Sequence, residues 1–222
     1  MSIEDVWPLF ALRLATPRLV LRVVRDDDLP GLADAALAGI HGERMPFMRP
    51  WSEEEPATLR RSLAQFQWRR RADLRPESWG LNFAVLRDGH PIGVQDLEAD
   101  DFGILRTVST GSWLTRSAQG QGFGTEMRQA VLTFAFDHLG ADYADSGAFD
   151  WNEPSLAVSR KLGYHPNGLA FASPRPGERA TEQRLRLAAA DFARPPWPVA
   201  VTAPPAALAA LLGDAAPTEP GA

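Results

Sequence analysis

Short apolar runs mark several β-strands along the chain. Residues 18–24 (RLVLRVV) alternate between apolar and polar positions, and residues 82–87 and 91–97 are apolar runs joined by Asp88-Gly89-His90. Alternation is typical of a half-buried strand, and an Asp-Gly turn between apolar runs is typical of a hairpin. The pattern therefore predicts a strand and then a hairpin, and residues 107–114 (TVSTGSWL) predict a further strand.

Other segments carry apolar residues at helical spacing. Residues 29–40 follow the three aspartates Asp26–Asp28, which can cap a helix, and their apolar members fall on one helical face. The same spacing predicts helices over residues 58–71, 127–139 and 152–163, the last ending at a glycine.

The order of these segments predicts one mixed domain of class α/β (α+β). Residues 142–150 predict a strand, and residues 164–172 and 181–187 predict a final pair of strands. The chain has 222 residues, 45% of them hydrophobic, which suits one compact domain with a short appendage. We place the domain over residues 1–190. Residues 191–222 are rich in proline and alanine and are expected to form a partly disordered tail.

Composition and charge narrow the functional classes. The chain has no cysteine, which excludes disulfides, thiolate metal sites and cysteine nucleophiles. Its net charge of −5 argues against non-specific nucleic-acid binding, and the arginine-rich segment 60–75 is expected to be a solvated helix of mixed charge. No signal peptide or membrane-length apolar stretch is apparent. We therefore expect a cytoplasmic protein with neither a membrane nor a nucleic acid as partner.

Three glycines stand at alternate positions in residues 116–127 (RSAQGQGFGTEM), between a predicted strand and a predicted helix. N–H groups at a helix start lack partners and carry partial positive charge, and glycines let an anion approach them. A Walker phosphate loop needs a lysine here, but the only lysine is Lys161. A dinucleotide loop needs a third glycine where Thr125 stands, which leaves a nicotinamide-dependent oxidoreductase as an alternative. The remaining ligand is the pyrophosphate of an acyl-CoA.

The loop Gln119-Gly120-Gln121-Gly122-Phe123-Gly124 resembles the Q/R-x-x-G-x-G/A signature of the GNAT acyltransferase superfamily. Three further segments, TPRLVLR, GSWL and NEPSLAVSRKLGY, resemble the branch that contains the ribosomal-protein N-terminal acetyltransferases. The resemblance spans about Leu12 to Leu187. Within the superfamily, the chain looks closest to an actinobacterial subgroup with a mycobacterial member described as a succinyltransferase.

The resemblance implies a fold and a donor site. The fold would be a single GNAT-type domain with a mixed central sheet of about seven strands, splayed in a V and flanked by about four helices. The pantetheine of the acyl donor would lie in the V, and its pyrophosphate would lie over the glycine loop. The residues expected to bind the donor are Trp113, Leu114, Thr115, Gln119, Gly120, Gln121, Gly122, Phe123, Gly124, Thr125, Asn152 and Ser155.

Two residues of the last predicted helix have both a structural and a functional interpretation. Asn152 and Ser155 match the branch's N-x-x-S motif, which implies that Asn152 binds the pantetheine and that Ser155 is a catalytic proton donor to the departing thiolate. Asn152 also suits the N-cap of that helix. Many relatives use a tyrosine as the acid, and Ser159 stands in its place here, so Ser155, Ser159 or water remains for this role. Tyr164 is expected to pack in the core.

The acceptor side is less defined. Residues 41–57 hold three prolines and several large apolar residues, which suit either satellite core or the wall of a substrate pocket. From this segment we expect substrate contacts from His41, Met45, Phe47 and Trp51. The general base stays open among five residues that also suit ordinary surface positions: Asp96, Glu98, His41, Glu43 and His90.

These observations predict an acyl-CoA-dependent N-acyltransferase that moves the acyl group directly to a primary amine of a small molecule or a protein. Acetyl-CoA is the expected co-substrate, succinyl-CoA is an alternative, and no metal is expected. A non-catalytic acyl-CoA-binding sensor is the rival function for the same loop. Homodimers are common in such folds, so a homodimer stays open beside a monomer, and no residue of the sequence decides between them.

Overall fold

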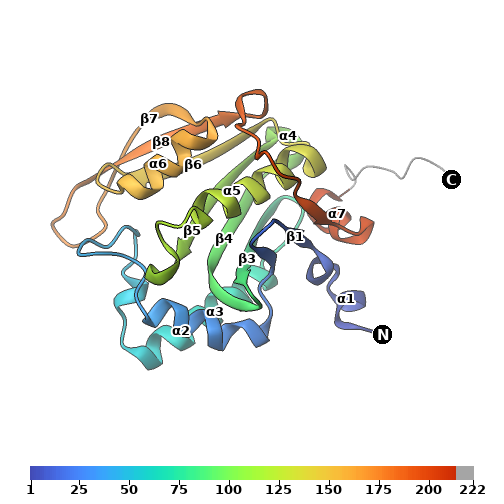
Figure 1. Cartoon of the computed structure of the whole chain (residues 1–222), viewed down its shortest axis with the longest axis horizontal. Coiled ribbons are helices and arrows are strands. Elements are labelled where there is room, and N and C mark those ends of the chain that lie inside the picture. The colour runs from blue at the N-terminus through green and yellow to red at the C-terminus, as the bar shows by residue number, and fades with distance from the viewer. Residues whose placement is uncertain (214–222) are drawn as a thin grey trace.

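Nine strands form one open sheet in the structure, a computed structural model that describes residues 1–213. Their spatial order is β7-β8-β6-β5-β4-β3-β2-β1-β9 (Figure 1). The strands are β1 Arg13–Ala15, β2 Val20–Val23, β3 Ser78–Arg87, β4 His90–Asp100, β5 Thr107–Leu114, β6 Tyr143–Phe149, β7 His165–Ala172, β8 Ala180–Ala188 and β9 Ala200–Thr202. The helices are α1 Ile3–Val6, α2 Leu29–Leu37, α3 Pro56–Ala72, α4 Phe102–Leu105, α5 Phe123–Thr133, α6 Glu153–Leu162 and α7 Pro205–Leu212.

Helices cover both faces of the sheet (Figure 1). α5 packs on one face, where Phe83 of β3 belongs to the same apolar cluster as Met127. α2 and α3 cover the other face, where Ala84 of β3 packs with Leu32. Successive residues of β3 therefore point into two different cores. Burial on both faces explains why residues 83–86 of this strand form a continuous apolar run.

The predicted hairpin is confirmed. β3 and β4 pair antiparallel, with a register shift between Val85 and Leu86. The turn residues Asp88 and Gly89 have φ values of 50° and 80°. Two successive residues with positive φ form the two-residue turn whose twist matches that of the strands.

The helix after the glycine loop begins earlier than its apolar spacing predicts. α5 starts at Phe123 rather than Met127, because Gly122 takes a left-handed conformation with φ of 83° and serves as the N-cap. Beyond Thr133 the helix widens into a π-helix over Phe134–Leu139, so the predicted end of the helical segment is confirmed.

The mixed α/β class is confirmed, but residues 1–213 hold more elements than the seven strands and four helices expected. β1 and β9 have three residues each, which is too short for an alternating pattern. α1 and α4 have four residues each, which is too short for helical spacing. Across the described chain, no helix combines the length and the apolar character needed to cross a membrane.

Part of the segment expected to be a tail packs on the domain instead. β9 pairs antiparallel with β1, where Val201 lies opposite Leu14, and this adds a strand at the sheet edge. α7 lies beside β1 in Figure 1, and its Leu211 is fully buried in the main core. The described part of the expected tail, residues 191–213, therefore includes two packed elements. Residues 214–222 lie outside the described residues.

The packing of α7 predicts a specific loss of stability. We expect Leu211→Ala to lower the free energy of unfolding by about 2–4 kcal/mol, because it leaves a cavity at a fully buried position. The matched control is Leu105→Ala, since Leu105 is 57% exposed and should change stability by less than about 0.5 kcal/mol. Denaturant unfolding followed by circular dichroism measures both values. Equal, small effects at the two positions would contradict the packed C-terminal segment.

Candidate functional site

β5 and β6 are parallel, and they stay paired over a short length. Residues 107–109 pair with residues 143–145. Beyond that point, residues 110–114 pair with β4 and residues 146–149 pair with β8, so the two strands part. In Figure 1 their ribbons spread from the end near α4. The V expected in the sheet is present, and its inner edges offer backbone N–H and C=O groups that no neighbouring strand uses.

The glycine loop lies at the open end of this fork. The chain turns through residues 115–122 from β5 into α5. Gly120 and Gly122 have φ of 73° and 83°, which glycine adopts without strain. Within the described residues, the backbone N–H groups of residues 120–125 donate to no acceptor. A Cβ at Gly120 would meet nothing within 4 Å, so the surface over these groups is open to an anion.

Two side chains of the loop face inward and hold its shape. The Gln119 Nε2 atom donates to the backbone oxygens of Ile40 and Leu114, both at 2.8 Å. The Phe123 side chain is 3% exposed and belongs to the main core. Both residues were expected to bind the donor. The structure leaves their backbones, rather than their side chains, for that contact.

Two arginines outside the loop clamp it from the side. Arg18 Nε donates to Glu126 Oε2 at 2.6 Å, and Arg18 Nη1 donates to the backbone oxygen of Gln121 at 3.0 Å. The Arg18 and Arg87 guanidinium groups lie 4.4 and 5.0 Å from the centroid of the Phe123 ring. Two cations therefore lie beside the N-terminus of α5, and each is paired with a carboxylate, Arg18 with Glu126 and Arg87 with Asp88. Sequence reasoning missed them because arginine is abundant along the whole chain and no pattern distinguishes these two.

The last residues of β5 face different surroundings. Leu114 and Thr115 are buried, and the Thr115 N–H donates to the backbone oxygen of Ile92 at 2.8 Å. Trp113 faces the α2 and α3 side, where its ring centroid lies 5.6 Å from that of Trp51. These three residues border the fork, as expected of donor-binding residues.

Asn152 caps α6, as one of its two interpretations predicts. Its Oδ1 accepts a hydrogen bond from the backbone N–H of Ser155 at 3.4 Å. Ser155 is partly exposed, and its hydroxyl forms no hydrogen bond within the described residues. Ser159, one turn further along, is 1% exposed and accepts a hydrogen bond from Arg128.

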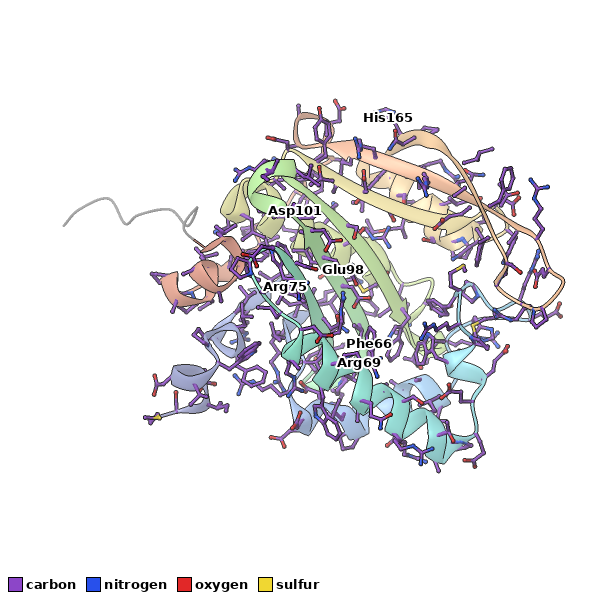
Figure 2. The ribbon with its side chains drawn as sticks, turned by 180° about the vertical axis from the view of Figure 1, so that it is seen from behind. Phe66, Arg69, Arg75, Glu98, Asp101 and His165 are labelled. Atoms are coloured by element: carbon purple, nitrogen blue, oxygen red, sulfur yellow. The ribbon has the colours of Figure 1, made fainter. Side chains whose placement is uncertain are left out.

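A cavity of about 940 Å³ lies on the α3 side of the sheet. Figure 2 shows this side, with Phe66 and Arg69 on α3 and Glu98 on β4. The cavity reaches β5 at residues 111–113, which are beyond its pairing with β6. The aromatic residues of its wall are Phe47, Trp51, Phe66, Trp79 and Trp113. A pocket of this size therefore meets the fork from the opposite face to α5.

The four expected substrate contacts fall into two pairs. Phe47 and Trp51 line the cavity, with ring centroids 5.8 Å apart. Met45 is 6% exposed and does not line the cavity, because its side chain packs inside the loop. His41 also lies away from the cavity, and its Nε2 faces Glu53 Oε1 at 3.8 Å. The geometry therefore supports an acceptor contact for the first pair alone.

Asp96 of β4 lies on the cavity floor, opposite Gly111 of β5. Its Oδ2 is 3.3 Å from the position a Cβ of Gly111 would take, so the glycine makes room for the carboxyl group. Its Oδ1 is shielded from solvent and has no hydrogen-bond partner within the described residues. Burial raises the pKa of Asp96 to about 7, the charge of Glu98 raises it too, and Arg70 lowers it. A carboxyl group with a pKa near neutrality is suited to accept a proton.

The other four candidate bases lack this setting. Glu98 forms an ion pair with Arg70, and His41 faces Glu53. Glu43 is exposed in its loop, and His90 is exposed at the β3–β4 turn. Asp96 was expected to be an ordinary surface residue rather than the base, but it lies beneath α3 on the floor of the cavity. Within residues 1–213, no three His, Cys, Asp or Glu side chains gather to hold a metal ion.

Asn82 of β3 lies opposite Asp96 on the same floor and is 3% exposed. Neither polar atom of its side chain has a hydrogen-bond partner within the described residues. A buried amide left unpartnered costs on the order of 1–3 kcal/mol. The Asn82 amide is therefore available to a polar group of a bound molecule.

Comparison with known proteins gives one family. Residues 18–165 match a family model described as an acetyltransferase (GNAT) domain. The Bacillus subtilis protein named "Probable N-acetyltransferase YjcK" is 28% identical over 111 residues, which are 50% of this chain and 60% of that protein. The Bacillus subtilis protein named "Putative ribosomal N-acetyltransferase YdaF" is 31% identical over 104 residues, 46% of this chain and 54% of that protein. The chain thus spans little more than half the length of these curated relatives.

A solved structure of Mycobacterium smegmatis RimJ in complex with CoA-disulfide has the same fold. It aligns over 82% of this chain and 88% of its own, with a TM-score of 0.66 and 21% identity. The forked sheet, the glycine loop and the family match over most of the chain agree with one another. The chain therefore belongs to the GNAT acetyltransferase family.

Proposed function

We propose that this protein transfers an acetyl group from acetyl-CoA directly to a primary amine. The observation that carries the proposal is the meeting of two sites at one stretch of β5. The fork and the glycine loop border residues 110–114 on one side, and the cavity holding Asp96 reaches residues 111–113 on the other. An acyl donor and an amine can therefore approach the same few residues from different directions, which is what direct transfer needs.

On the donor side, the free N–H groups of residues 120–125 bind the pyrophosphate, and Arg18 holds the loop in shape by donating to the backbone oxygen of Gln121. The unpaired edges of β5 and β6 offer hydrogen bonds to the amide groups of the pantetheine arm. The RimJ neighbour is described as a complex with CoA-disulfide, which supports the same donor here. Asn152 and Ser155 lie at the start of α6, close to this arm in the proposal.

On the acceptor side, Asp96 takes a proton from the amine. The nitrogen attacks the thioester carbonyl carbon, the C–S bond breaks, and its electron pair stays on sulfur. Free backbone N–H groups of β5 polarise the carbonyl oxygen. Ser155 stays the proposed proton donor to sulfur: its hydroxyl is free within the described residues, and because it is partly exposed it regains from water the proton that it passes on.

The raised pKa of Asp96 favours an enzyme over a non-catalytic acyl-CoA sensor, because a sensor does not need a proton acceptor in its cavity. The family match leaves the oxidoreductase alternative without support. A protein amine as acceptor is supported by the name of YdaF, and a small-molecule amine by the depth of the cavity.

Succinyl-CoA is a second donor candidate, in line with the resemblance to the actinobacterial succinyltransferase subgroup. Its distal carboxylate would need a cation. Arg49 and Arg69 line the cavity, and neither forms an ion pair within the described residues. Thermal shifts with acetyl-CoA and succinyl-CoA, compared at equal concentration, separate the two donors.

The glycine loop predicts a loss of donor affinity on substitution. We expect Gly120→Ala to weaken CoA binding about tenfold or more, because the added methyl group stands where the pyrophosphate approaches the N–H groups. Gly168→Ala is the matched control, since Gly168 also has positive φ and open space around it but lies on β7. Isothermal titration calorimetry gives both dissociation constants. Equal affinity in the two variants would contradict the loop as the pyrophosphate site.

The role of Asp96 predicts a pH profile. We expect kcat/KM for amine acylation to rise with pH and to level off above about pH 7, where the carboxylate is ionised. Asp96→Asn should lower kcat/KM by about 10²- to 10⁴-fold and remove this ionisation from the profile. A panel of primary amines, with release of free CoA as the signal, supplies the measurement. An unchanged profile in the variant would show that another group takes the proton.

The raised pKa of Asp96 also predicts how stability depends on pH. Stability should fall with rising pH, whereas kcat/KM should rise. The folded Asp96 carboxyl holds its proton up to about pH 7, while the unfolded value is 3.8, so wild-type stability falls as the pH rises between these values. Asp96→Asn avoids this loss and should be more stable than the wild type at pH 8, by up to about 4 kcal/mol, with little difference at pH 4. Asp27→Asn, at an exposed position, is the control and should show no such change. Denaturant unfolding at the two pH values decides between these outcomes.

A further inference from the structure

Arg128 of α5 is a charged residue that the proposed function does not use. It is 4% exposed, and no carboxylate of the described residues lies within salt-bridge distance of it. Its Nη1 donates to Ser159 Oγ and its Nη2 donates to Ser112 Oγ, both at 3.1 Å. Its Nε is buried without a hydrogen-bond partner within residues 1–213. The partners of this cation are thus neutral.

Such a residue is costly in a purely structural role. Taking a guanidinium group out of water costs several kcal/mol, and a carboxylate or other anion normally offsets that cost. Burial lowers the pKa of Arg128. The neighbouring polar groups, Tyr164 and Thr110, are also neutral hydroxyls, 3.4 Å apart. The cluster of Arg128, Ser112, Ser159, Thr110 and Tyr164 holds no carboxylate of its own, and the Asp145 carboxylate, whose charge acts on Tyr164, is paired with Arg186.

The cluster around Arg128 lies close to the part of the sheet where the proposed reaction produces a negative charge. Ser112 belongs to the part of β5 that has separated from β6, next to Gly111, which faces Asp96. Ser159 lies on α6, one turn beyond Ser155. Because side chains alternate across a strand and Asp96 of β4 lies opposite Gly111, Ser112 and Asp96 are on opposite faces of the sheet. The cation therefore lies behind the fork, on the side away from the amine cavity.

The hydrogen bonds of the cluster also have a defined direction. Guanidinium groups donate and never accept, so the oxygen atoms of Ser112 and Ser159 are acceptors in these bonds. Each hydroxyl keeps its own hydrogen, and neither donates it to an acceptor within the described residues. Two O–H donors, both next to the same cation, thus have no acceptor within the described residues.

We propose that Arg128, acting through the Ser112 and Ser159 hydroxyls, stabilises the sulfur anion that forms when the C–S bond of the acyl donor breaks. This inference rests on the proposed function. The electron pair of the broken bond stays on sulfur until Ser155 passes a proton to it, and the amine proton passes to Asp96 on the other face of the sheet. Arg128 is a positioning residue here, because it acts on sulfur through the two serines.

The ionisation of bound CoA tests this without an acceptor. The ultraviolet absorbance of the thiolate, titrated with pH in the complex and corrected with the desulfo-CoA complex, gives the pKa of the bound thiol. We expect this pKa in the wild-type complex to lie at least one unit below that of free CoA, a tenfold change in ionisation constant. Arg128→Met should return it to the free value, while the affinity for desulfo-CoA changes less than threefold.

Two further variants keep the test decisive if Arg128→Met does not fold. Arg128→Lys keeps the charge and should retain part of the shift, and Ser112→Ala with Ser159→Ala keeps the arginine but should lose most of it. A bound thiol with the same pKa as free CoA in the wild-type complex would overturn the inference while leaving the proposed function standing. Absence of CoA binding by the wild type would instead contradict the proposed function itself.

Discussion

The short parallel contact between β5 and β6 sets the geometry on which the other features depend. Residues 107–109 pair with residues 143–145, after which each strand keeps its outer neighbour and leaves an inner edge free. Parallel strands need a crossover connection, and here α5 supplies it. The N-terminus of α5 must therefore lie where β5 ends, at the open end of the fork. One feature of topology thus places free strand edges and unpartnered helix N–H groups together.

β5 also separates two chemical environments. On the α3 side, Gly111 leaves room for the Asp96 carboxyl group at the floor of an aromatic-lined cavity. On the α5 side, Ser112 accepts a hydrogen bond from a buried cation, Arg128. Alternation of side chains therefore places a proton acceptor and a positive charge on opposite faces of the sheet. This arrangement suits a reaction in which one atom loses a proton while a neighbouring atom gains negative charge.

Local patterns predict the elements that depend on local rules. The Asp88-Gly89 turn, the strand at residues 107–114 and the capping of α6 by Asn152 are confirmed, because each depends on a few adjacent residues. The glycine loop is recognisable for the same reason. The short β9 was not predicted, because three residues carry no period and its place comes from pairing with β1.

Residues whose role comes from distant contacts were harder to predict. Asp96 gains its altered pKa because α3 covers it and because Gly111 of another strand makes room for it. The two arginines at the loop, Arg18 and Arg87, stand more than 30 positions before the glycines in sequence. Met45 and His41 show a related difficulty, since sequence alone does not tell which side chains of an apolar loop line the cavity and which, like these two, do not.

Hydrogen exchange with and without CoA tests the central claim most directly, because it reports on backbone N–H groups and requires no acceptor. The claim is that the donor binds along the fork and over the glycine loop. CoA should slow exchange in residues 110–114, 146–149 and 120–125, and leave β7 unchanged. Binding of CoA with no protection at the fork or the loop would contradict the account.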